Sequence, residues 1–194
     1  MLFFPYHKES FNMSKKFDEL STKHIEFIEQ QKIFFVGTAA PNGTVNVSPK
    51  GYKSLKVVSP SRIIWLNVTG SGNETSAHVQ INPRMTMMFT SFEGPPVTLR
   101  VYGKARVIHR LDNEWATLNS HFSKIVGARQ IFDLSIDLVQ TSCGMSIPLF
   151  EYKGERDAQI KWATKKGDSG LREFWAEENQ QSIDGFPTNI LEKS

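Results

Sequence analysis

Short, strand-like apolar runs recur along most of this chain, and a turn signal separates each run from the next. The turns are marked by Asn-Gly, Ser-Pro, Asn-Pro and Gly-Pro-Pro. The runs lie at 32–39, 44–48, 53–58, 62–68, 84–91, 97–109 and 131–140. About seven strands at this short, regular spacing, with few helices between them, predict a closed or nearly closed antiparallel barrel and not a doubly wound parallel sheet.

Helical patterns are confined to the flanks of these strands. Apolar residues recur at helical spacing over 15–31, and 111–124 also has a helical pattern. The C-terminal residues 153–194 are mostly helical in pattern, broken at Gly167–Gly170, and carry large apolar groups such as Trp162 and Trp175. We therefore expect a mainly β fold with flanking helices, whose tail packs on the barrel or lies across a subunit boundary and covers a ligand. Residues 1–14 are expected to form an N-terminal extension.

The composition indicates one soluble globular domain. Hydrophobic residues make up 39% of the 194 residues and charged residues 22%. The formal net charge of +3 arises from 23 basic and 20 acidic residues, a surplus too small and too dispersed to indicate nucleic-acid binding. No apolar run approaches the roughly 18 residues of a membrane helix. The single cysteine, Cys143, excludes an intramolecular disulfide and fits a reducing compartment, so we expect a cytoplasmic protein, for which access to the nucleus stays open.

The segment Ile63–Phe89 has the pattern strand, glycine-containing turn, short helix, Asn-Pro stop and strand. A helix start has unpaired backbone N–H groups and the positive end of the helix dipole, so it favours an anion. Ser71 and Glu74 fit the S-x-x-E capping box, and Gly70 and Gly72 are expected to let the backbone turn tightly and approach a ligand. These features predict a phosphate-binding loop. The P-loop and G-x-G-x-x-G patterns are absent, so neither a nucleotide hydrolase nor a dinucleotide site is indicated.

A second polar segment, NVSPKGYKSLKV at 46–57, also has residues suited to bind phosphate. Because side chains alternate along a strand, Asn46, Ser48 and Lys50 share one face. A lysine at a strand end can bind phosphate as a point charge. If this strand neighbours 62–68, the three side chains face the turn at 71–75 across a groove.

Other chemistries find little support in the sequence. The five histidines show no H-E-x-x-H or other paired ligand spacing, so no metal site is expected. There is no G-x-S-x-G nucleophile elbow. No side chain demands a general-base role, and the catalytic residues stay unknown at this stage.

Three blocks of the sequence resemble the pyridoxamine 5′-phosphate oxidase-like proteins, which have the FMN-binding split barrel. They are NVSPKGY, WLNVTGSGNETSAHVQINPRMTMMF and FEGPPVTLRVYGKARV. The tail motifs SCGMSIPL, GERD, W-x-x-K-K-G and SIDGFPT resemble one subgroup of that family, and the resemblance covers roughly residues 15–188. It implies an FMN-binding split-barrel domain over 15–152, of six strands, in a homodimer with FMN in each of two clefts at the dimer interface.

The resemblance also implies roles for individual residues. Ser48 and Lys50 match the family's basic strand end near the FMN phosphate, with Asn46 on the same face. Ser71, Asn73 and Thr75 match the phosphate loop. Trp65 and Asn67 match the strand beside the flavin ring, and Arg100 lies on the strand that contributes across the interface. Structural alternatives remain open for several of them. Ser71 and Asn73 could cap a helix, Trp65 could belong to the core, and Arg100 could form an ion pair at a strand edge.

The sequence departs from the family pattern at the places that bind phosphate and substrate. N-V-S-P-K-G and G-S-G-N-E-T stand where the oxidases have an Arg-rich strand and an S-R-K type loop. The tail reads SIDGFPTNILEKS, where the oxidases carry an arginine and a histidine for the substrate's phosphate. The resemblance therefore indicates the cofactor and leaves the small-molecule substrate open.

The leading hypothesis is an FMN-dependent oxidoreductase in which the flavin supplies the redox chemistry and the protein supplies binding and orientation. The alternatives are a non-catalytic flavin-binding module, a split-barrel reductase that uses a deazaflavin (F420), a haem-binding relative, and a structural dimer whose site has decayed. The absorbance spectrum of the purified protein distinguishes them.

Overall fold

The computed structural model of the protein describes residues 14–193. The N-terminal extension expected over 1–14 lies outside the described residues, apart from Ser14. The elements are β1 (Ser14–Phe17), α1 (Thr22–Gln30), β2 (Phe34–Ala39), β3 (Val45–Lys50), β4 (Leu55–Ser59), β5 (Arg62–Val68), α2 (Glu74–Ile81), β6 (Arg84–Thr90), β7 (Val97–His109), α3 (Trp115–Asn119), β8 (Ala128–Cys143) and α4 (Ala158–Glu178).

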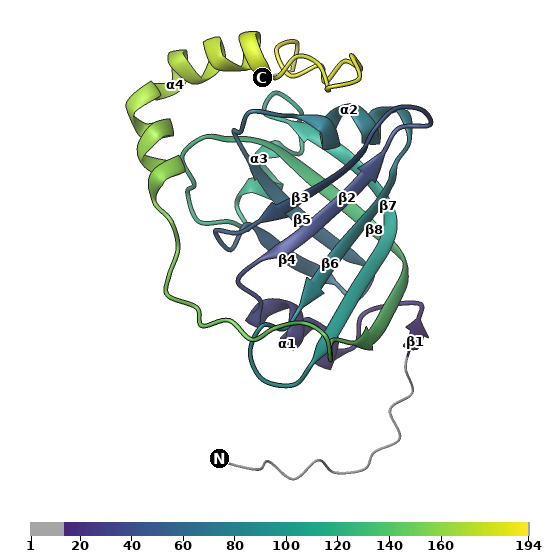
Figure 1. Ribbon diagram of the computed structural model, residues 1–194. Coiled ribbons are helices and arrows are strands. Elements are labelled where there is room, and N and C mark those ends of the chain that lie inside the picture. The colour runs from purple at the N-terminus through teal and green to yellow at the C-terminus, as the bar shows by residue number, and fades with distance from the viewer. Residues whose placement is uncertain (1–13, 194) are drawn as a thin grey trace, which may run out of the picture.

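The strands form one antiparallel sheet that curls around a central core (Figure 1). Their order is β3-β2-β6-β7-β8-β5-β4, with β1 paired to the free edge of β8. The two end strands, β3 and β4, are consecutive in sequence, and no ladder joins them within residues 14–193. The barrel is therefore split between β3 and β4. This architecture confirms the predicted mainly β fold with flanking helices and an antiparallel split barrel.

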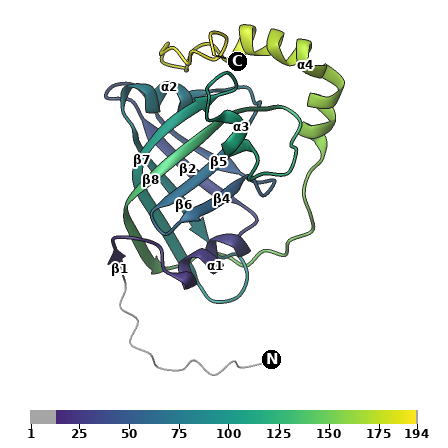
Figure 2. The same cartoon turned by 180° about the vertical axis from the view of Figure 1, so that it is seen from behind.

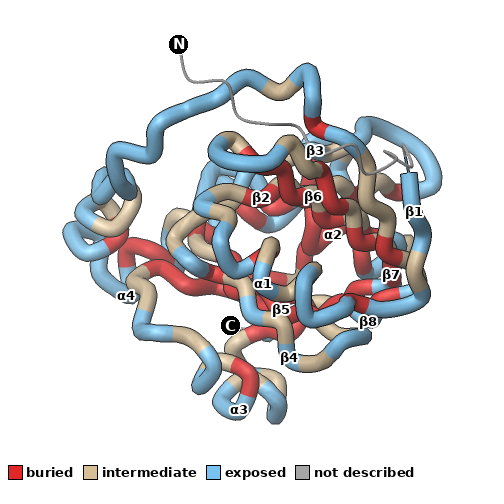
Figure 3. Tube along the Cα trace, turned by 90° about the horizontal axis from the view of Figure 1, so that it is seen from below, coloured by how far each residue is buried: buried red, intermediate tan, exposed pale blue. Residues whose placement is uncertain are grey.

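The apolar residues of β5 follow one another without polar alternation, because both faces of this strand are covered. Ile63 and Trp65 pack into the barrel interior, whereas Ile64 and Leu66 pack outward with Leu118 of α3. Figure 2 shows α3 on this outer side, and Figure 3 shows the buried residues forming the inside of the barrel. Since β5 is held on both sides, its C-terminal end is a firm support for the loop that follows it.

Two helix boundaries differ from the prediction. The helix expected over 15–31 begins at Thr22, because the Ser21 side chain caps it and residues 14–17 pair with β8. Pairing with the open edge of β8 satisfies backbone groups that a helix would otherwise satisfy. The helix expected over 111–124 is shortened to α3, since a turn precedes it in which the Asp112 carboxylate accepts a hydrogen bond from the His109 N–H.

The C-terminal segment packs on the barrel of its own chain. Helix α4 is kinked at Gly167, whose φ of 66° and ψ of 178° lie outside the helical region. Leu171 and Trp175 of α4 and Ile190 beyond it form a small apolar cluster. In Figure 1 the last residues, coloured yellow, pass above α2.

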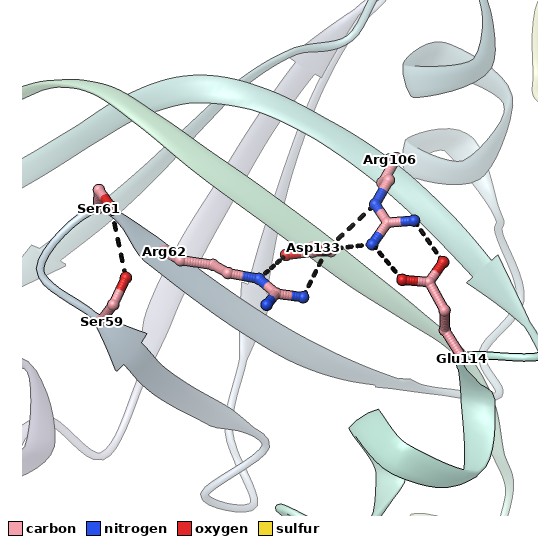
Figure 4. Close-up of polar contacts among 6 residues, drawn as sticks. All are labelled: Ser59, Ser61, Arg62, Arg106, Glu114 and Asp133. Atoms are coloured by element: carbon pink, nitrogen blue, oxygen red, sulfur yellow. Dashed lines mark hydrogen bonds and ion pairs between the residues drawn. The ribbon is translucent and has the colours of Figure 1, made fainter.

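A network of ion pairs joins three neighbouring strands on the outside of the barrel (Figure 4). Asp133 of β8 accepts hydrogen bonds from Arg62 of β5 and Arg106 of β7, and Arg106 also pairs with Glu114. Burial alone would raise the pKa of Asp133, but the hydrogen bonds from the two arginines outweigh burial and lower it. The Asp133 carboxylate therefore stays charged and ties β5, β7 and β8 together.

Gly103 lies where the register of β7 against β8 shifts. A Cβ atom on this residue would lie 1.9 Å from the Ser135 carbonyl oxygen, which belongs to the rigid backbone of β8. We expect Gly103→Ala to lower the free energy of unfolding by about 2–4 kcal/mol, because the two strands must move apart. Denaturant unfolding followed by tryptophan fluorescence measures this change.

Gly37→Ala in β2 is the matched control, since the nearest atom to its Cβ would be the Thr86 carbonyl oxygen at 3.8 Å. Its free energy of unfolding should stay within about 1 kcal/mol of the unsubstituted protein. Equal unfolding midpoints for the two variants would contradict the close approach of β7 and β8 at Gly103.

Candidate functional site

A cavity of about 320 Å³ lies at the split in the barrel, between the end of β3, the end of β5 and the loop before α2. It brings together eight of the nine residues that the sequence singled out, from segments far apart in the chain: Asn46, Ser48, Lys50, Trp65, Asn67, Ser71, Asn73 and Thr75. Arg129, which the sequence did not single out, also lines it.

The strand β3 presents its polar face to this cavity. Asn46, Ser48 and Lys50 line it, whereas Val45 and Val47 point the other way and are 73% and 66% exposed. The Asn46 amide donates a hydrogen bond of 3.2 Å to the Thr75 hydroxyl, which joins β3 to the start of α2. The face of β3 and the 71–75 turn therefore meet directly.

Lys50 carries an unpaired charge in this cavity. Its Nζ lies 5.0 Å from the centroid of the Trp65 ring, and the lysine forms no ion pair with any described residue. Burial, and secondly the positive charge of Arg129, lower the pKa of Lys50 to about 8. The negative charge of an anion bound here would oppose both effects and favour the protonated ammonium.

Arg129 is the second cation of the site and is only 3% exposed. Its guanidinium donates to the carbonyl oxygen of Gly72 at 2.6 Å and to the amide oxygen of Asn179 at 2.6 Å. With the Asn67 amide oxygen turned toward it, Arg129 also donates to Asn67 at 3.2 and 3.3 Å. Within residues 14–193 no carboxylate lies at ion-pair distance, and burial lowers the pKa of Arg129 to about 9.

The sequence did hold a signal for Arg129. Arg129 lies at the start of β8 in the run ARQIFDLSI, where the surrounding residues are buried. Because arginine is almost never fully buried unless it is paired, an arginine at the start of such a strand indicates a partner elsewhere in the fold. The partners here are neutral oxygens, which the sequence alone could not reveal.

The loop at 70–73 directs its carbonyl groups to Arg129. The Gly70 and Gly72 oxygens both accept from its guanidinium. In a trans peptide the N–H points opposite to the C=O, so the N–H groups of Ser71 and Asn73 point away from Arg129. Among the described residues none accepts a hydrogen bond from the N–H of Ser71, Gly72 or Asn73. Successive free N–H groups of this kind form an anion-binding nest.

The capping box predicted for Ser71 and Glu74 is wrong. The helix begins at Glu74 with Asn73 as its N-cap residue, and no side chain caps it. The Glu74 carboxylate instead accepts from the backbone N–H of Ile183 at 3.0 Å, because the C-terminal tail lies against the helix start. The Asn73 amide donates to the backbone oxygen of Asn179, and its own Oδ1 has no partner among the described residues.

The two glycines of the loop differ from the prediction in one respect, the need for glycine in the turn itself. Neither Gly70 nor Gly72 has a positive φ, so the turn itself does not require glycine. A Cβ on Gly70 would meet no protein atom within 4 Å, although Gly70 lines the cavity. The space beside Gly70 is therefore open for the close approach of a ligand.

Trp65 is a core residue, as the structural alternative had it, and its place beside a flavin ring stays a prediction. It is 1% exposed and its ring stacks on Phe132 with 4.7 Å between centroids, as a core residue does. It also lines the cavity and lies under the Lys50 ammonium.

Arg100 lies apart from the cavity. It is half-buried on β7, where its Nη1 donates to the Ser142 hydroxyl at 3.0 Å, and it forms no ion pair with the residues described. Among the described residues, Arg100 therefore does not form the strand-edge ion pair that the sequence left open. Its role across a dimer interface stays a prediction.

A larger cavity of about 870 Å³ adjoins the first, and the two share Pro49, Lys50, Gly51 and Tyr52. Its aromatic lining includes Phe92 and Phe150, whose ring centroids are 5.2 Å apart. Across residues 14–193, no cluster of three or more His, Cys, Asp or Glu could hold a metal ion. The cavity that contains Arg129 thus opens beside a roomier one with an aromatic lining.

Comparison with known proteins assigns the family. Residues 20–143 match the family model described as Pyridoxamine 5′-phosphate oxidase. The chain is 31% identical over 191 residues to the pyridoxamine 5′-phosphate oxidase family protein ustO of Aspergillus flavus, covering 88% of this chain and 76% of the relative. The chain belongs to the pyridoxamine 5′-phosphate oxidase family.

Solved structures agree with this pyridoxamine 5′-phosphate oxidase family fold. A Lactobacillus delbrueckii protein named as a pyridoxamine 5′-phosphate oxidase has a TM-score of 0.50 at 18% identity, covering 63% of this chain and 94% of that one. A HupZ variant of Group A Streptococcus also has a TM-score of 0.50, at 15% identity, covering 61% and 96%. At such identities the likeness shows the fold alone.

Within the described residues, no helix is long and apolar enough to cross a membrane.

The Lys50 titration tests the electrostatics of this family member's cavity. In protein labelled with carbon-13 at the lysine Cε, one resonance should titrate near pH 8, since burial and Arg129 disfavour the charged ammonium. Lys50→Arg should remove that resonance and so assign it. Arg129→Met should raise the pKa of Lys50, because one of the two causes is then gone. A Lys50 resonance that titrates at the ordinary lysine value would contradict this description of the cavity.

Proposed function

We propose that this protein is a homodimeric FMN-dependent oxidoreductase that acts on a small-molecule substrate. The observation that carries the proposal is a pair of cations, Lys50 and Arg129, that share one cavity with a loop of free backbone N–H groups and have no carboxylate partner among the described residues. Phosphate is the group of FMN that such a site would hold.

The other lining groups fit the rest of that cofactor. Ser48 Oγ and Asn73 Oδ1 are buried without a partner among the described residues, so a hydroxyl and an acceptor are available to a polyhydroxyl chain such as ribityl. Trp65 gives the cavity an apolar surface. When bound, the flavin ring would supply the redox chemistry, by accepting electrons or a hydride from the substrate.

The donor set of the cavity supports a flavin over haem. Of the residue types that ligate haem iron, the described lining contains one tyrosine, Tyr52, and no histidine, cysteine or methionine. The larger adjoining cavity is within the range of small-molecule sites, so it offers room for a substrate beside the cofactor.

The exposed face of β3 supports the homodimer. Val45 and Val47 are exposed apolar residues on the strand whose opposite face lines the cavity. Neighbouring exposed apolar residues of this kind are typical of an interaction surface. A second copy seated there would lie close to the cofactor.

Selectivity between FMN and riboflavin tests the proposal, because the two ligands differ only in the phosphate. Lys50→Met should weaken FMN about 10- to 100-fold, the loss expected for one charge-assisted contact. Riboflavin should bind with nearly unchanged affinity. Quenching of flavin fluorescence gives both dissociation constants.

Lys56→Met is the matched control, since it removes the same charge from an exposed position on β4 that lines neither cavity. Unchanged FMN affinity in Lys50→Met would contradict the phosphate assignment. A Soret band in the purified protein would support haem instead. FMN binding without oxygen consumption in the presence of pyridoxamine 5′-phosphate or related substrates would favour a non-catalytic flavin-binding module.

A further inference from the structure

Among the contacts of the C-terminal segment with the loop region, those of Asn179 reach the carbonyl groups of the 70–73 loop. Asn179 caps the C-terminus of α4 and is completely buried. The segment 70–73 that it contacts precedes it by more than a hundred positions in sequence. In Figure 1 the end of α4 and the yellow tail lie over the same end of the barrel as α2.

The Asn179 side chain bonds both to the buried cation and to the loop. Its Oδ1 accepts from Arg129 Nη1 at 2.6 Å. Its Nδ2 donates to the carbonyl oxygens of Gly70 at 3.0 Å and Ser71 at 3.4 Å. Together with the bonds from Arg129 to Gly70 and Gly72, this gathers three successive loop carbonyls on one side. Their peptide N–H groups then point to the other side.

The tail also holds Asn179 in place. The Thr188 hydroxyl donates to the Asn179 backbone oxygen at 2.6 Å, and the Trp175 indole donates to the Thr69 hydroxyl at 2.9 Å. The Thr188 carbonyl in turn accepts from Ser76 Oγ in α2. The orientation of Asn179 is thus fixed from the tail, from α4 and from α2.

The neutrality of the Asn179 amide matters as much as its position. An amide oxygen satisfies one Arg129 donor and leaves the positive charge uncancelled, whereas a carboxylate at the same place would pair with it. The arginine charge is then free to act on an anion in the cavity.

We propose that Asn179 is a positioning residue that makes the site selective for a phosphate-bearing ligand. It does so by holding Arg129 and the 70–72 carbonyls so that the loop N–H groups stay available to the anion. The inference rests on the proposed function and extends it to a residue outside the cavity lining.

The test compares FMN with riboflavin in three variants. Asn179→Asp supplies a carboxylate beside Arg129 and removes the donors to Gly70 and Ser71. It should lower FMN affinity about 10- to 100-fold and leave riboflavin within about threefold. Asn179→Ala removes the hydrogen bonds without adding a charge, and should reduce the FMN-to-riboflavin selectivity at least about threefold. Gln180→Ala is the control, because among the described residues the exposed Gln180 side chain, just beyond the end of α4, bonds only to the Ala176 carbonyl of α4.

A merely structural role predicts a different pattern. If Asn179 only stabilised the fold, FMN and riboflavin would weaken by equal factors, and that result overturns the inference. Should Asn179→Asp fail to fold, Asn179→Ala decides by the same ratio. If the unsubstituted protein binds FMN and Lys50→Met lowers its selectivity, but both Asn179 variants keep it, the proposed function stands and only this inference fails. If the unsubstituted protein shows no preference for FMN over riboflavin, both fail.

Discussion

The buried guanidinium of Arg129 is the interaction on which this end of the protein depends. Removing a cation from water costs several kcal/mol even after the protein relaxes, and no carboxylate of residues 14–193 pairs with it. Neutral oxygens offset the cost instead, from the loop carbonyls and the amides of Asn67 and Asn179. Because these oxygens face Arg129, its guanidinium holds the loop conformation and the position of the tail. The same group supplies positive charge to the cavity.

The barrel gives this arrangement a rigid support. Strand β5 is packed on both faces, by the interior around Trp65 and by α3 against Ile64. Its neighbour β8, which carries Arg129, is tied to β5 and β7 by the Asp133 ion pairs on the outer surface. Opposite, the edge strand β3 ends at the split with Lys50 facing inward. Because the barrel is split here, the polar side chains at the end of β3 line an open cavity. In a closed barrel they would be buried.

The C-terminal tail, which is distant in sequence, completes the site from outside. Its contacts to the loop are side-chain hydrogen bonds from and to Asn179, supported by Thr188 and Trp175. The Glu74 carboxylate, which the capping rule assigned to the helix start, is engaged by the tail at Ile183. A local sequence rule failed here because a long-range contact competed for the same group.

The sequence by itself determined the fold class and singled out eight of the residues that line the candidate cavity. Period-two alternation and turn residues set the strands, and alternation placed Asn46, Ser48 and Lys50 on one face of β3, because these are properties of neighbouring residues. Only the tertiary structure decided that residues 14–17 extend β8, that Glu74 bonds the tail, and that Arg129 and Asn179 stand behind the loop. Those contacts join residues tens to more than a hundred positions apart, and no local periodicity records which buried donor meets which acceptor.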